Sequence, residues 1–281
     1  MNDDLAVMLF AGALGAIIGS FLNVCILRLP ANQSVVSPPS RCPKCGSGVK
    51  WYDNIPVLSW LVLRGKCRNC QNPISVQYPL VELTTGLIWA WMASRYGFEL
   101  DALRAALFLT ILLGIAMTDA REYIIPDEFS LGGLTLGILL SLIHGWHGAI
   151  PALIGAAVGF TLMWLIAEGG KRAFKKEAMG GGDLKMMAMV GAFVGWQGVF
   201  LTIFMGAVVG TVAFLPIVVL HFLKNAGSKA KASTSGETET SASSEELPLV
   251  PFGVFLAIAA AIVFLWGDVL IGWYTNYVFN A

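Results

Sequence analysis

The chain has 281 residues, of which 56% are hydrophobic and only 13% are charged, and its mean hydropathy is +0.71. A soluble domain of this length cannot hide so much apolar surface in one core, so the composition excludes an ordinary soluble enzyme and indicates a membrane protein. The formal net charge of zero says nothing about partners by itself, but the uneven placement of the charges indicates an orientation in the bilayer.

The first apolar segment covers residues 5–27 and is long enough to cross about 30 Å of hydrocarbon at about 1.5 Å per residue. A cleaved signal peptide is the alternative interpretation. It is disfavoured because the chain begins Met-Asn-Asp-Asp, without a basic region, and because no small-residue cleavage site follows the segment. We therefore predict a first transmembrane helix within residues 1–29.

A polar insert follows at residues 30–79 and is rich in proline, glycine, cysteine and basic residues, with Asp53 as its single acid. By the positive-inside rule the insert is cytoplasmic, so the N-terminus is predicted to lie outside.

Four of the five cysteines form two Cys-x-x-Cys pairs in this insert, Cys42 with Cys45 and Cys67 with Cys70. Two such pairs close a tetrahedral zinc site with four cysteine ligands, which is structural because no coordination position stays open for catalysis. Four reduced surface cysteines are the alternative, but an insert with few apolar residues favours a metal core. Cys25 lies in the first helix and is interpreted as a small packing residue.

Seven further apolar segments make an all-α polytopic membrane protein of about eight transmembrane helices. Alternating crossings place the loops 119–127, 168–183 and 224–250 on the side of the insert, where most of the remaining lysines and arginines also fall. The segments lie near residues 80–96, 102–118, 128–147, 150–167, 184–196, 198–223 and 252–275.

A stretch poor in bulky apolar residues, 225–250, is predicted to be a disordered cytoplasmic linker. It divides a transmembrane core, 80–224, from the last helix and C-terminus, 251–281.

Two acids stand at the cytoplasmic ends of predicted helices: Asp119 closes one apolar run and Asp183 opens another. Ionisable groups at the edge of a bilayer are costly and usually face a wet cavity inside the protein, so two at one depth suggest a shared site. Aspartic peptidases need such a pair, in which one carboxylate activates water and the other protonates the scissile carbonyl.

Each acid also has a simpler interpretation. Asp183 is explained equally by an N-cap, with Gly180, Gly181 and Gly182 forming only a turn, and Asp119 by a solvated loop position. If the pair is catalytic, the glycines instead let an extended peptide approach the aspartate closely.

Several motifs, in order over most of the chain, resemble those of the type IV prepilin peptidases, and the linker is the chief departure from that pattern. The motifs are Gly19-Ser20-Phe21-Leu22-Asn23-Val24, the paired Cys-x-x-Cys insert, Tyr78-Pro79-Leu80-Val81-Glu82, Thr118-Asp119 followed by Ile125-Pro126-Asp127, and Gly180-Gly181-Gly182-Asp183-Leu184-Lys185.

The resemblance implies an aspartic endopeptidase of the bacterial inner membrane that removes the leader of prepilins or type II secretion pseudopilins at the cytoplasmic face, typically between Gly and Phe. Asp119 and Asp183 match its two catalytic positions. It also implies N-methylation of the new N-terminus by S-adenosylmethionine, whose site the sequence does not reveal. The expected partners are prepilin or pseudopilin substrates and the lipid bilayer; no nucleic acid is expected, and the oligomeric state is left open.

Three further ionisable residues accompany these motifs. Asp127 is predicted mainly to cap the fourth transmembrane helix, with participation as a third acid as the alternative. Glu82, at the head of the second, is favoured there by the helix dipole and is the candidate for positioning the amine in methyl transfer. Lys185 is either a membrane anchor or a group that tunes the neighbouring aspartate.

The helix ends predict different roles for the two aspartates. Asp183 begins a helix and meets its partial positive end, whereas Asp119 follows a helix expected to end near Thr118 and meets a partial negative end. We therefore predict that Asp183 serves as the base and Asp119 holds the shared proton.

Two other functions compete with this one. The first is a Gly-x-Gly-Asp membrane protease without methyltransferase activity. The second, from a different class, is an ion-coupled transporter, which also uses acids in broken helices. Acids at one face rather than at the midplane, and the lack of a clear inverted repeat, count against transport.

Overall fold

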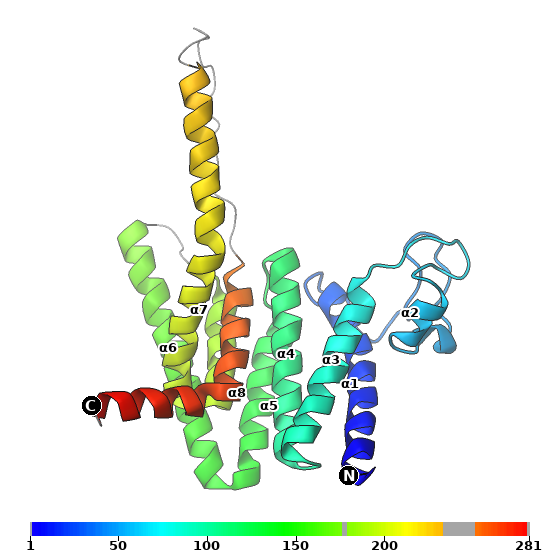
Figure 1. Ribbon diagram of the computed structural model, residues 1–281, viewed down its shortest axis with the longest axis horizontal. Coiled ribbons are helices and arrows are strands. Elements are labelled where there is room, and N and C mark those ends of the chain that lie inside the picture. The colour runs from blue at the N-terminus through cyan, green and yellow to red at the C-terminus, as the bar shows by residue number, and fades with distance from the viewer. Residues whose placement is uncertain (1, 176–178, 233–250, 280–281) are drawn as a thin grey trace.

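The computed structural model describes residues 2–175, 179–232 and 251–279, and all regular elements within them are helices (Figure 1). The predicted all-α class is therefore confirmed. The elements are α1 (Asn2–Arg28), η1 (Trp51–Asn54), α2 (Leu58–Val62), α3 (Gln77–Tyr96), α4 (Leu100–Glu122), α5 (Asp127–Ser141), η2 (Leu142–His144), α6 (Trp146–Phe174), α7 (Gly181–Ala232) and α8 (Phe252–Phe279).

Five of these helices, α1, α4, α6, α7 and α8, are long and apolar enough to cross a membrane. The chain is thus a multi-pass membrane protein. Figure 1 shows these helices standing side by side in one bundle, with the C-terminal end of α8 turning away from it.

Helix α7 consists of two helices that run in opposite directions. Its backbone leaves helical geometry at Gly195, where φ is 72° and ψ is 175°, a conformation that glycine adopts without steric cost. Just before this reversal, the carbonyl of Phe193 accepts a 2.8 Å hydrogen bond from Arg104 in the first turns of α4. After it, Gly210 packs against Phe255 at the start of α8, at the opposite end of the bundle. The two apolar segments predicted on either side of this point therefore form a helical hairpin.

Helices α1 and α3 approach closely because glycines line their contact. A Cβ atom at Gly15 would lie 2.6 Å from Cβ of Trp89, and one at Gly19 would lie 2.8 Å from Cα of Glu82. Small residues at this spacing allow membrane helices to bring their backbones together. The contact places the end of α1 beside the start of α3, so the insert leaves and re-enters the bundle at neighbouring points.

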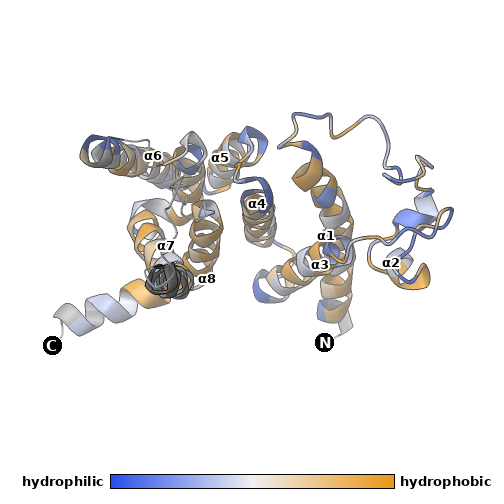
Figure 2. Cartoon of the chain, turned by 90° about the horizontal axis from the view of Figure 1, so that it is seen from above, coloured by the Kyte–Doolittle hydropathy of each residue, from blue (hydrophilic) through white to orange (hydrophobic). Residues whose placement is uncertain are grey.

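The insert packs beside α1 and α3, on the side of them away from α7 and α8 (Figure 2). Figure 2 shows α4 in the middle, between the α1–α3 pair and the group formed by α7 and α8. Within the insert, Arg68 holds Asp53 through hydrogen bonds of 2.6, 2.9 and 3.1 Å. The Arg68 guanidinium lowers the pKa of Asp53, so this forked pair keeps its charges at neutral pH.

The predicted linker is described only in part. Residues 225–232 continue α7, so the helix extends further than the predicted boundary at 225. Residues 233–250 lie outside the described residues.

Candidate active site and metal centre

Asp119 and Asp183 meet at one end of the bundle. Asp119 occupies the last turn of α4, where its side chain is buried, and Asp183 occupies the first turn of α7. The charge of Asp119 acts on Asp183, so the two carboxylates lie within electrostatic range of each other.

The N-terminus of α8 holds the carboxylate of Asp119. The backbone N–H of Val254 donates to Oδ2 of Asp119 at 3.0 Å, and the N–H of Gly253 also donates to this carboxylate. A Cβ atom at Gly253 would lie only 2.9 Å from the same Oδ2 and 2.9 Å from Cδ1 of Ile125. Only glycine therefore allows the helix end to come this close to the aspartate.

Sequence reasoning did not identify Gly253 and Val254 as site residues. The available signal was the Pro251-Phe252-Gly253 stretch that opens the last apolar segment, a proline and a glycine where a helix begins. Nothing in that stretch indicates which distant group the exposed N–H groups serve.

Asp183 lies in the first turn of α7 and caps the N-terminus of this helix. The N–H of Gly180 donates to the Asp183 carboxylate, and the N–H of Asp183 donates to the carbonyl of Gly180 at 3.3 Å. This is a capping-box arrangement, in which an acid in the first turn reaches back to the residue that precedes the helix. The carboxylate of Asp183 thus accepts a backbone N–H at the start of the helix, as the capping interpretation predicted. However, Gly180 and not Asp183 occupies the N-cap position.

The three glycines do not form a turn. Gly181 and Gly182 already belong to α7, and no left-handed φ is found at Gly180, Gly181 or Gly182. A Cβ atom at Gly182 would lie 3.0 Å from Cβ of Ile125, whereas one at Gly181 would meet nothing within 4 Å. Close approach thus matters at Gly182, where α7 passes the loop after α4.

The helix-end argument for the roles of the two aspartates rests on a wrong boundary. Helix α4 does not end near Thr118 but continues to Glu122, and Tyr123 closes it in the left-handed conformation with φ 55°. The carboxylate of Asp119 also meets the positive end of α8, so both Asp119 and Asp183 face a helix N-terminus. The predicted asymmetry therefore has no support from the helix dipoles.

Asp127 and Lys185 form an ion pair next to the aspartates. Lys185 Nζ lies 2.7 and 2.8 Å from the two carboxylate oxygens of Asp127. Asp127 is the first residue of α5 and Pro126 occupies the N-cap position, so Asp127 does not lie at the predicted capping position. The pair instead ties the N-terminus of α5 to that of α7.

Glu82 is buried where the insert meets the bundle. It is 8% exposed and lies in the second turn of α3, deeper than the first-turn position that the dipole argument assumed. Its carboxylate accepts hydrogen bonds from the N–H of Val57 at 2.7 Å and from the hydroxyl of Ser20. Glu82 therefore joins α3, α1 and the insert and does not lie with the two aspartates.

The four insert cysteines come together in two matching loops. In the first, the N–H of Gly46 donates to the carbonyl of Cys42 at 2.9 Å, and in the second, the N–H of Gln71 donates to the carbonyl of Cys67 at 3.0 Å. Each loop also closes with an isolated antiparallel bridge, Arg41 to Gly48 and Lys66 to Pro73. Every position of one loop corresponds to the other, a local repeat that sequence reasoning missed.

The cluster has the geometry of a metal site. Its sulfur atoms all lie within 4.8 Å of one another, and Sγ of Cys42 lies 3.7 Å from Sγ of Cys70. Zinc–sulfur bonds of about 2.3 Å place tetrahedral sulfurs about 3.8 Å apart, so the donors fit this ion. Hydrogen bonding with Ser47 lowers the pKa of Cys45 to about 6, which favours the thiolate that a metal requires.

The sequence of the chain was compared with known protein families and with curated proteins. Residues 13–96 match the bacterial peptidase A24 N-terminal domain, and residues 106–215 match the type IV leader peptidase family. A prepilin leader peptidase/N-methyltransferase of Stutzerimonas stutzeri is 36% identical over 98% of this chain and 96% of its own length. The chain belongs to the type IV leader peptidase family.

Two other relatives in this family carry the same name. The protein from Pseudomonas aeruginosa is 35% identical over 95% of this chain and 93% of its own length. The one from Myxococcus xanthus is 45% identical over 75% of this chain, which spans 63% of that relative. No solved structure matches the chain. The second matched region contains both Asp119 and Asp183, and the first contains Glu82 and the cysteine cluster.

Proposed function

We propose that this protein is an aspartic endopeptidase of the bacterial inner membrane that removes the leader peptide from type IV prepilins or type II secretion pseudopilins. It then methylates the new N-terminus with S-adenosylmethionine. The observation that carries the proposal is the meeting of Asp119 and Asp183 at one end of an apolar bundle, in a chain whose relatives are named prepilin leader peptidase/N-methyltransferase.

The two carboxylates divide the work of hydrolysis. One accepts a proton from water as the water oxygen attacks the scissile carbonyl carbon, and the other donates a proton to the carbonyl oxygen. The resulting intermediate then collapses, the C–N bond breaks and the leaving nitrogen takes a proton from the pair. The N–H groups of Gly253 and Val254 fix Asp119 for this task, and the N–H of Gly180 fixes Asp183.

The orientation of the protein in the membrane is assigned from the distribution of its basic residues. We place the aspartates, the cysteine insert and the loop after α6 on the cytoplasmic side and the N-terminus outside, because lysine and arginine concentrate there. Eight crossings result when α1, α3, α4, α5, α6, the two halves of α7 and α8 each count as one. We propose the domains as residues 1–29, 30–79, 80–224, 225–250 and 251–281, with residues 225–232 of the fourth continuing α7.

The competing functions receive less support. A transporter needs its acids near the midplane, whereas both aspartates lie at helix ends. Proteolysis alone accounts for neither the insert nor the N-methyltransferase part of the relatives' names.

The test is cleavage of a prepilin by purified protein in detergent, with the product mass measured with and without S-adenosylmethionine. We expect loss of the leader in both samples and a gain of one methyl group only with the donor. Absence of cleavage would refute the peptidase, and cleavage without the added methyl group would refute the second activity.

We also propose that the cysteine cluster holds one structural zinc ion. Purified protein is expected to contain about one zinc per chain, and Cys67→Ser to lose it, because structural sites need all four ligands. Elemental analysis and limited proteolysis check this, and the insert of the variant should be cut at least about tenfold faster than that of the wild type. Cys25→Ser is the control, since that buried thiol lies in α1, away from the cluster. Full zinc content in Cys67→Ser would contradict the assignment.

A further inference from the structure

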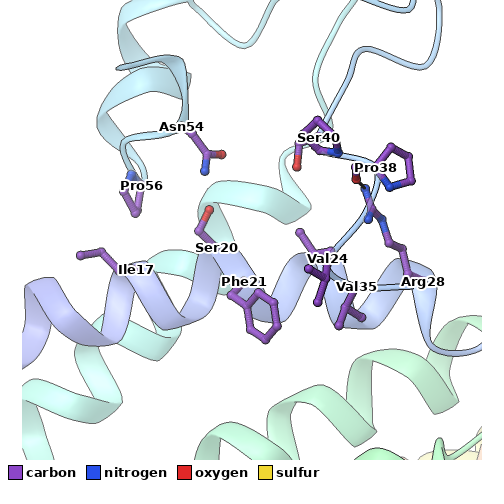
Figure 3. Close-up of a pocket in the computed structure, with 12 residues that line it drawn as sticks. Ile17, Ser20, Phe21, Val24, Arg28, Val35, Pro38, Ser40, Asn54 and Pro56 are labelled. Carbon is purple, nitrogen blue, oxygen red and sulfur yellow. Dashed lines mark hydrogen bonds between the residues drawn. The ribbon is translucent and has the colours of Figure 1, made fainter. Parts of the chain in front are cut away.

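A cavity of about 340 Å³ lies between α1 and the insert (Figure 3). Most of the residues that line it carry apolar side chains, and the polar side chains of Ser20, Ser40 and Asn54 are neutral. Among the described residues of this lining, Arg28 is the only charged one and no acid is present. The lining therefore favours a ligand with one negatively charged group and an apolar body.

The α1 wall of the cavity is a single face of that helix. The residues of this face are Ile17, Phe21, Val24 and Arg28 (Figure 3). Their spacing of four, three and four residues places them above one another on the helix surface. Arg28 is the last residue of the apolar span Asp4–Arg28, and Ile17 lies about 16 Å from it along the helix axis, about half of the 30 Å of bilayer hydrocarbon. The face thus runs from the middle of the bilayer to the level of the lipid headgroups.

This face is open to lipid. The side chains of Ile17 and Phe21 are 58% and 53% exposed, although both residues lie within a helix that is long and apolar enough to cross the membrane. Exposed apolar side chains at this depth contact bilayer hydrocarbon and not water. An acyl chain that lies along this face therefore stays inside the hydrocarbon.

Arg28 is fixed where a headgroup would lie. Its guanidinium donates to the carbonyls of Ser34 at 2.9 Å and Pro38 at 2.8 Å. These bonds use two of its five N–H donors, and none of the ion pairs in the described part of the chain includes Arg28. Arginine donors match the oxygens of a phosphate group, which accept charge-assisted hydrogen bonds. The remaining donors of Arg28 therefore suit a phosphate.

The insert has an apolar outer face near this cavity. Helix α2, which begins shortly after the lining residue Pro56, exposes the side chains of Leu58, Leu61 and Val62. Figure 1 shows α2 beside the upper part of α1 and α3 and not above their ends. A short apolar face at this level packs into the bilayer surface, and the exposed Arg64 after it meets anionic headgroups. The insert is thus placed to cover a lipid that lies against α1.

We propose that this cavity binds an anionic phospholipid, with the phosphate on Arg28 and one acyl chain along Ile17, Phe21 and Val24. The hydroxyl of Ser40, on the insert side of the cavity, is a further hydrogen-bonding group for the headgroup. The bound lipid joins the insert to α1, in addition to the hydrogen bond from Val57 to Glu82 that joins the insert to α3.

Binding of phosphatidylglycerol to delipidated full-length protein in detergent, measured by native mass spectrometry, tests this site without relying on activity. Phosphatidylcholine with the same acyl chains is the comparison lipid. We expect phosphatidylglycerol to bind at least about tenfold more tightly, because the choline cation finds no acid among the described residues of the lining.

Arg28→Gln is expected to weaken phosphatidylglycerol binding at least about tenfold, because the charge-assisted hydrogen bonds to the phosphate are lost. The matched control is Arg172→Gln. Arg172 is an exposed arginine in the last turn of α6, which is also long and apolar enough to cross the membrane, but it lies outside the cavity. This control should bind within about twofold of the wild type.

Val24→Phe fills the cavity from the α1 side while Arg28 stays in place, and it is expected to weaken binding at least about tenfold. Leu9→Phe enlarges an exposed residue of the same helix outside the cavity and should bind as the wild type does. This second pair decides the test if Arg28→Gln disturbs the insert, since Arg28 also holds the carbonyls of Ser34 and Pro38.

Three outcomes would overturn the assignment. The first is equal binding of the two lipids by the wild type, and the second is wild-type binding of phosphatidylglycerol by both Arg28→Gln and Val24→Phe. The third is complete displacement of phosphatidylglycerol by excess inorganic phosphate, which would show that the cavity takes a free phosphate compound and not a lipid.

Discussion

Asp119→Asn and Asp183→Asn are each expected to lower prepilin cleavage by at least about 10³-fold, because general acid–base work by a carboxylate contributes about 10²–10⁴-fold and an amide neither accepts nor donates the proton. Since the two carboxylates act on each other, the double variant should be no slower than the worse single variant. Cleavage rates with purified protein in detergent, under single-turnover conditions, measure this.

The matched control for these variants is Glu122→Gln. Glu122 is an exposed acid at the end of the helix that carries Asp119, and its loss should change the rate by less than about threefold. Both aspartate variants should keep the zinc content of the wild type, which shows that the insert has folded. Cleavage by either variant at the rate of Glu122→Gln would remove that aspartate from the mechanism.

Gly253→Ala is expected to lower cleavage by about 10²-fold, although it adds a single methyl group far along the chain from either aspartate. The new Cβ atom would lie 2.9 Å from Oδ2 of Asp119, so either the carboxylate or the N-terminus of α8 must shift. A displacement of about 1 Å in a catalytic group costs a rate factor of this size. The same kinetic assay measures the loss.

Gly272→Ala separates this effect from a general effect of alanine in the helix. Gly272 also lies in α8, and a Cβ atom there would meet nothing within 4 Å. Alanine is favoured over glycine in a helix by up to about 1 kcal/mol, so Gly272→Ala should be slightly more stable and fully active. Equal activity of the two variants would show that the contact between Gly253 and Asp119 does not position the acid.

The membrane helices were predictable because their apolar runs are long. The hydropathy of the chain located the helix pair that meets at Gly195, since a glycine at a break between two apolar segments is a local signal. The end of α4 was predicted too early for the same reason. Apolar character stops at Thr118, but the helix continues through polar residues to Glu122.

The surroundings of the aspartates were less predictable because they depend on contacts between distant segments. The hydrogen bond from Val254 to Asp119 joins residues 135 positions apart, and the pair of Lys185 with Asp127 joins residues 58 apart. Neither leaves a periodic pattern in the sequence. Asp127 was predicted to cap a helix because it follows a proline at the start of that helix. In the structure its carboxylate instead pairs with Lys185 of α7.

The dependence of Asp119 on the N-terminus of α8 also affects how the enzyme is made. Synthesis proceeds from the N-terminus, so both aspartates are in place well before Gly253 and Val254 leave the ribosome. Until then the Asp119 carboxylate lacks the two N–H donors that hold it. A partly translated chain therefore lacks the contact that fixes Asp119, and this contact forms only when the last helix has entered the membrane and docked.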